Sequence, residues 1–143
     1  MIAPGTTKLG RTIPALPARD VAASVEFYCE RLGFEAVHHD GGFAVLRRDD
    51  AVVHLWEAND ASWAKRVAGD PPVRSGAESF LAGTASCRIE VEGVDELYAE
   101  LRERDVLHPV SRDGLTETAF GTREFATLDG DGNLISFYVW VTP

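Results

Sequence analysis

The sequence has little that would suit a secreted, membrane-spanning or metal-clustered protein. Among its 143 residues there are only two cysteines, Cys29 and Cys87, and their spacing is not that of a metal site. No apolar run approaches the ~20 residues that span a membrane, and the first residues lack the apolar stretch of a secretory signal. These features predict a cytoplasmic protein with reduced thiols.

An excess of positive charge is also absent. The chain carries 14 Lys and Arg against 23 Asp and Glu, a formal net charge of −9. Nucleic-acid binding depends on basic side chains that neutralise phosphates, and anionic membrane surfaces attract basic segments, so the sequence disfavours both partners. An acidic surface concentrates cationic molecules, which is compatible with a cationic ligand, although solubility alone would explain the charge.

What the sequence does contain is an ordered series of helix and strand patterns. One helix is expected to begin after the N-cap Asp20 and to end at Gly33, and a second begins at Val94. The two helix starts lie about half a chain apart, as in a duplicated βαβββ unit. Strands are expected over residues 11–17, 34–39, 43–48, 51–57, 86–93, 122–128 and 133–140.

This repeat predicts an α+β domain over residues 1–143. Module one is expected at 11–57, a linker rich in Gly, Pro, Ser and Ala at 58–84, and module two at 85–143. Neither unit could bury its strands alone, whereas two together form a curved mixed sheet with the helices outside. A linker of this length in a compact domain is typically functional or mobile.

Alternation along the strands separates an apolar face from a mixed one. In residues 51–57, Val53 and Leu55 share one face and oppose His54 and Trp56. The same alternation in the later strands produces a mixed face of Ser86, Arg88, Glu90, Ser136, Tyr138 and Trp140. Aromatic walls with a few polar groups are typical of a ligand pocket. A solvated sheet face or a second core layer is the alternative.

Four stretches together resemble one protein family. PALPARDVAASVEFYCERLGF, FAVLRRDD, GVDELYAEL and FGTREFATLDGDGNLISF follow one another in the chain. They are similar to the bleomycin-resistance proteins of the vicinal oxygen chelate (VOC, or glyoxalase-like) superfamily, over residues 12–57 and 85–140. The resemblance implies the glyoxalase/bleomycin resistance fold and a homodimer. Dimers of this family often exchange the N-terminal strand between subunits, and Pro14 stands where the family has its hinge proline.

The resemblance also implies how a ligand would be held. Binders of this family grip the flat bithiazole tail of the antibiotic between two aromatic side chains, in a cleft shared by both subunits. Phe43 matches the first of them, and Phe120, followed by Gly121, stands where the family usually has tryptophan. Phenylalanine still stacks, with less area and no indole N–H.

The same superfamily contains metalloenzymes, which hold a divalent metal with His and Glu side chains from strands. The resemblance places the corresponding positions at Ile13, His54, Ser86 and Ser136. Only His54 suits a transition metal, and a site needs three or four converging ligands. Glu90 and Glu124 would add ligands in a shifted strand register, so a metal-dependent lyase or dioxygenase is the alternative function. The sequence predicts no catalytic residue, no metal and no cofactor.

The favoured hypothesis is an antibiotic-binding protein that sequesters a cationic, aromatic glycopeptide of the bleomycin type without catalysis. A binder of an unrelated small molecule is a third hypothesis that the sequence does not separate from the first. The expected ligand-binding residues are Phe43, Phe120, His54, Trp56, Arg88, Glu90, Ser136 and Tyr138.

Overall fold

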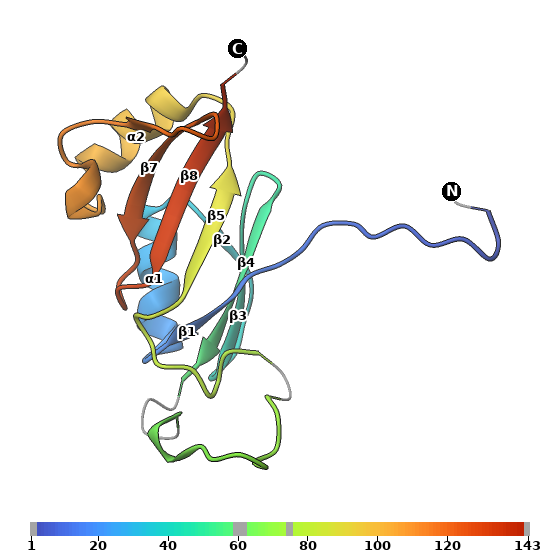
Figure 1. Cartoon of the computed structure of the whole chain (residues 1–143). Coiled ribbons are helices and arrows are strands. Elements are labelled where there is room, and N and C mark those ends of the chain that lie inside the picture. The colour runs from blue at the N-terminus through green and yellow to red at the C-terminus, as the bar shows by residue number, and fades with distance from the viewer. Residues whose placement is uncertain (1–2, 59–62, 74–75, 142–143) are drawn as a thin grey trace.

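The duplicated pattern read from the sequence is present in the computed structural model, which describes residues 3–58, 63–73 and 76–141 (Figure 1). Each module forms a four-stranded mixed sheet, ordered β1-β4-β3-β2 in module one and β5-β8-β7-β6 in module two. The elements are β1 Ala15–Ala18, α1 Val21–Arg31, β2 Glu35–His39, β3 Phe43–Arg48, β4 Ala51–Glu57, η1 Trp63–Lys65, β5 Ser86–Glu90, α2 Val94–Glu103, η2 Pro109–Ser111, β6 Thr116–Glu117, β7 Thr122–Leu128 and β8 Leu134–Trp140.

Local chemistry explains where the two helices begin. The carboxylate of Asp20 accepts a hydrogen bond from the backbone N–H of Ala23 and so caps α1, as the sequence predicts. At α2 the cap position is Gly93 in a left-handed conformation. Asp95 and Glu96 occupy the first turn, where acidic side chains interact favourably with the positive end of the helix dipole. Within the described residues, no helix is long and apolar enough to cross a membrane.

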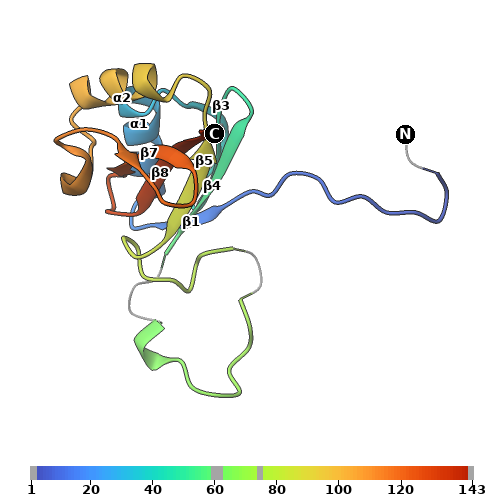
Figure 2. The same ribbon diagram turned by 45° about the horizontal axis from the view of Figure 1, so that its top comes forward.

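The two modules share one hydrophobic core between their helices and sheets. The core cluster contains Tyr28 from α1, Leu101 from α2, Leu55 from β4 and Phe137 from β8. Figure 2 shows α1 and α2 together on one side of the strands. The expectation that each half cannot bury its own apolar face is therefore consistent with the packing.

The turn between β7 and β8 connects the modules through buried polar groups. Tyr28 donates a hydrogen bond of 2.8 Å to Asp129, and Asn133 donates one of 2.9 Å to the Pro17 carbonyl of β1. The Asn133 side-chain oxygen also accepts hydrogen bonds from the backbone N–H groups of Gly83 and Ala85. The GDGN segment is thus a structural turn, and its polar atoms are already engaged.

The first strand and the segment 107–121 differ from what the sequence predicts. The first strand begins at Ala15, later than the predicted range 11–17, because Pro14 precedes the strand and the chain before it extends away from the body (Figure 1). The segment 107–121, for which no helix or strand is expected from the sequence, contains the one-turn η2 and the two-residue β6. Elements this short produce no recognisable periodicity.

Candidate functional site

The open face of module one carries a cluster of aromatic side chains. The ring centroid of Phe43 lies 4.5 Å from Trp56, 5.1 Å from His54 and 5.8 Å from His38. Strand register explains the cluster, since Phe43 pairs with Trp56 and Val45 pairs with His54 across β3 and β4. The predicted face is confirmed: Val53 and Leu55 are fully buried on the other side.

His54 is half-buried within this cluster, and burial lowers its pKa below the ordinary value. Removal from water disfavours the imidazolium, so the ring is neutral at physiological pH. The neighbouring rings of Phe43 and Trp56 are apolar surfaces on which a flat aromatic group can stack. Module one therefore offers a half-exposed aromatic surface.

The open face of module two is organised around an ion pair. Arg88 on β5 donates two hydrogen bonds to Glu124 on β7, at 2.7 and 3.2 Å, and its guanidinium lies 4.8 Å from the ring centroid of Tyr138. Thr122 donates a further hydrogen bond of 2.6 Å to Glu124. The pKa of the Glu124 carboxyl is lowered, chiefly by the hydrogen bonds from Arg88 to its charged form.

Strand register also determines where the other predicted ligand-binding residues of module two lie. Ser136 pairs with Arg88 and is buried, while Glu90 pairs with Tyr138 and is exposed. Among the described residues, no hydrogen bond, ion pair or ring contact joins this face to the aromatic cluster of module one. The structure of one chain thus divides the predicted site residues into two groups.

Phe120 lies apart from both groups, in the loop between β6 and β7. Its side chain is 64% exposed. The loop is anchored at the end of the sheet, because the Val141 N–H donates to the Gly121 carbonyl and Thr122 pairs with Trp140. Phe43 and Phe120 therefore do not form a sandwich within one chain.

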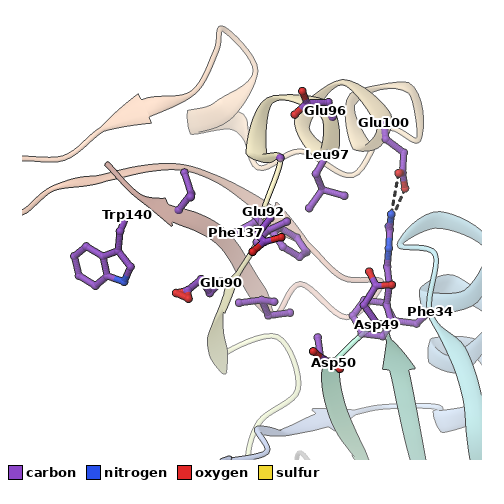
Figure 3. A pocket seen from close by; sticks show the side chains of 16 residues that line it. Phe34, Asp49, Asp50, Glu90, Glu92, Glu96, Leu97, Glu100, Phe137 and Trp140 are labelled. Atoms are coloured by element: carbon purple, nitrogen blue, oxygen red, sulfur yellow. Dashed lines mark hydrogen bonds and ion pairs between the residues drawn. The ribbon is translucent and has the colours of Figure 1, made fainter. Parts of the chain in front are cut away.

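A cleft of about 830 Å³ opens between the modules, close to this end of the sheet (Figure 3). Its apolar lining includes Phe34, Leu97 and Phe137, and Trp140 lies at its side. Carboxylates reach it from the β3–β4 turn, from β5 and the turn that follows, and from α2; they are Asp49, Asp50, Glu90, Glu92, Glu96 and Glu100. The cleft also contains Arg48, whose guanidinium is hydrogen-bonded to both carboxylate oxygens of Glu100.

The structure places the residues that the sequence suggested as metal ligands on several different elements. Ile13 precedes β1, and the register places Ala15 beside His54. Ser86 is exposed on β5, and the carboxylate of Glu124 is already bound by Arg88 and Thr122. Within the described part of the chain, no group of three or more His, Cys, Asp or Glu side chains is arranged to hold a metal ion.

Comparison with known proteins places this arrangement in a family. The family model described as the Glyoxalase/Bleomycin resistance protein/Dioxygenase superfamily matches residues 8–137. The chain belongs to this superfamily. Its members named "Bleomycin resistance protein" in Geobacillus stearothermophilus and in Staphylococcus aureus (strain MRSA252) are each 52% identical to it over 128 residues, 90% of this chain and 95% of theirs.

Solved structures of the superfamily share the fold. A bleomycin-binding protein from Streptomyces verticillus, in complex with copper(II)-bleomycin, has a TM-score of 0.67 and 26% identity and covers 96% of this chain and 100% of its own. A lactoylglutathione lyase from Agrobacterium tumefaciens also has a TM-score of 0.67, at 19% identity, over 93% of this chain and 95% of its own. Because one fold serves both kinds of protein, the fold alone does not determine function.

Within this superfamily fold, sequence reasoning missed three features. His38 is not among the expected ligand-binding residues, but a register shift between Ala36 and His38 in β2 brings its ring to Phe43. Glu124 was considered only as a metal ligand, and its pairing with Arg88 depends on strand neighbours that the sequence does not reveal. The acidic cleft was missed because its carboxylates come from separate elements, although the net charge of −9 was a weak signal of it.

Proposed function

We propose that this chain binds a bleomycin-type antibiotic and confers resistance by sequestration, with no bond made or broken. The observation that carries the proposal is the half-exposed cluster of Phe43, His54 and Trp56, in a chain 52% identical to proteins named for bleomycin resistance. Protection by this route requires only that binding lowers the concentration of free drug. The protein acts in the cytoplasm, where its two free thiols remain reduced.

The aromatic cluster binds the flat part of the drug. Stacking on Phe43 contributes roughly 1 kcal/mol per ring pair beyond the area buried. Because burial lowers the pKa of His54, the imidazole adds no positive charge that would repel a cationic ligand. The carboxylates of the cleft attract the positively charged part of the drug and speed its capture.

The complete site requires a second copy of the chain. Phe120 of one subunit covers the drug that stacks on Phe43 of the other, which accounts for why both side chains remain accessible in one chain. Residues 3–14 extend from the body, and Leu9 among them is 94% exposed, as expected of an arm that crosses to a partner at the hinge Pro14. Sedimentation of the full chain should give the mass of a dimer; a monomer at all concentrations would contradict this part of the proposal.

Calorimetric titration of the purified protein with several bleomycins tests the function directly. Saturable binding at one drug per cleft is the expected result. A flat trace at high micromolar concentration for every bleomycin would reject the proposal in favour of an unrelated ligand. Titration with and without copper(II) in the drug separates recognition of the aromatic tail from recognition of the metal-binding region.

A further inference from the structure

The second half of the linker lies directly against the aromatic cluster. Gly76 packs so closely on Trp56 that a Cβ atom at this position would be 2.0 Å from Nε1 and 2.3 Å from both Cδ1 and Cε2. Side chains essentially never approach so closely, and the obstacle is a rigid ring. Only glycine therefore allows the linker backbone to rest on the pyrrole part of this indole.

The segment that carries Gly76 is held by contacts at its start and beyond its C-terminal end. Ala77 is fully buried, and the carboxylate of Glu78 accepts a hydrogen bond of 2.8 Å from the Gly76 N–H. Farther along, Arg19 donates to the Ala82 carbonyl at 2.9 Å, and the Gly83 N–H donates to the buried Asn133. These contacts fix the backbone that covers Trp56, unlike a connection that only joins two modules.

Trp56 transmits the contact to the ring that is proposed to bind the drug. Its centroid is 4.5 Å from that of Phe43, with an angle of 47° between the planes. A change in the orientation of Trp56 would alter the surface on which a flat ligand stacks, since ring pairs depend on offset and angle.

We propose that residues 76–81 form a wall of the aromatic site, and that Gly76 is a positioning residue which fixes the Trp56 ring against Phe43. The inference deepens the proposed function and rests on it for its ligand. It gives the linker a role in selecting ligands: a bulkier residue at position 76 moves the wall and the ring together.

The contact is tested first without any ligand, in a Trp63→Phe/Trp140→Phe background where Trp56 is the only tryptophan. Gly76→Ala should shift the Trp56 emission to longer wavelength and increase its quenching by acrylamide, because the linker no longer covers the indole. Gly41→Ala is the matched control, since a Cβ there meets nothing within 4 Å. Unchanged emission in Gly76→Ala would overturn the proposal.

Bleomycin titration of the same variants tests the positioning role. Gly76→Ala should bind about tenfold more weakly, equivalent to about 1.4 kcal/mol, while Gly41→Ala binds like the parent. Equal affinity of Gly76→Ala and parent would overturn the positioning role even if the emission shifts. If the parent itself binds no bleomycin, the proposed function and the ligand-selecting role fall together, and the emission still decides whether the linker contact exists.

A double variant distinguishes the loss of this one contact from a general loss of stability. Phenylalanine at position 56 lacks the pyrrole ring that an alanine at position 76 would strike. Gly76→Ala should therefore lower the Tm clearly in the parent and much less in Trp56→Phe, because the two positions are in contact and their effects are not additive. Equal Tm losses in both backgrounds would overturn the contact.

Discussion

The open faces of the two modules have the same strand order but place their charged groups differently with respect to their aromatic rings. In module one, Phe43 lies among other aromatic rings, and the ion pair that Arg47 makes on the same face lies toward the other end of β3. In module two, the corresponding sheet face is dominated by the Arg88–Glu124 pair beneath Tyr138. One face offers apolar area to a ligand, whereas the other satisfies its own polar groups.

This difference shows how two modules with the same strand order can serve different purposes, one ligand binding and the other stability. A side chain whose hydrogen bonds are already made within the protein gains little from a ligand, while a half-exposed aromatic ring gains by being covered. We therefore expect substitutions on the open sheet face of module one to affect drug binding, and substitutions on the open sheet face of module two to affect stability.

Phe43→Ala should produce the largest effect on binding and the sharpest test of this contrast. Loss of the central ring should weaken bleomycin binding by about 2 kcal/mol or more, roughly 30-fold. Calorimetry measures the loss, and Val37→Ala, an exposed apolar position on β2, is the control. If Phe43→Ala binds within twofold of the parent, the aromatic face of module one is not the binding surface.

Arg88→Met should reverse the pattern, with a loss of stability of about 1 kcal/mol and drug affinity within twofold of the parent. Glu124 then keeps only the hydrogen bond from Thr122. The pKa of Glu124 is lowered in the folded protein, so its contribution to stability is present above the unfolded value of about 4.3 and is lost as pH falls through the folded value.

Urea unfolding from pH 6 to pH 3 measures that prediction. The stability gap between the parent and Arg88→Met should narrow as the pH falls. In Arg88→Met/Glu124→Gln, which removes both charges, the loss should be smaller than in Arg88→Met alone. A gap that stays constant over this range would show that the ion pair does not account for the stability of this face.

His54 should give a smaller pH signature of the same sign in module one, starting at a higher pH. Burial lowers the pKa of the folded imidazole, so the unfolded chain takes up a proton first as the pH falls below about 6.5 and stability declines from there. The loss should grow toward pH 5 and disappear in His54→Gln. NMR titration of the imidazole is the direct measurement; a folded pKa at or above the ordinary value of about 6.5 would contradict the prediction.

The smallest expected effect is a difference in reactivity between the two cysteines, one in each module. Burial is the main cause that raises the pKa of Cys87, to about 11, and it also raises that of Cys29. At pH 8 only about one Cys87 in a thousand is a thiolate, so Cys29→Ser should react slowly with a thiol reagent until it is unfolded. Cys87→Ser, which retains Cys29, should react faster; equal rates would show that the two environments do not differ.

Sequence reasoning predicted the elements and faces that local patterns determine. Alternation separated Val53 and Leu55 from His54 and Trp56 because strand period alone decides it. The acidic cleft, the Arg88–Glu124 pair and the contact between Gly76 and Trp56 each join residues far apart in the chain. No local pattern encodes such long-range contacts, so they could be found only once the strands had been placed.

The turn that joins β7 and β8 makes the folding of each module depend on the other. Asn133 near the end of the chain completes the hydrogen bonding of Pro17 near its beginning, and Asp129 does the same for Tyr28. Neither module is therefore expected to fold alone, because a buried polar group in each would lose its partner without the other. Two fragments divided within the linker should thus remain unstructured apart and regain the native state only when mixed.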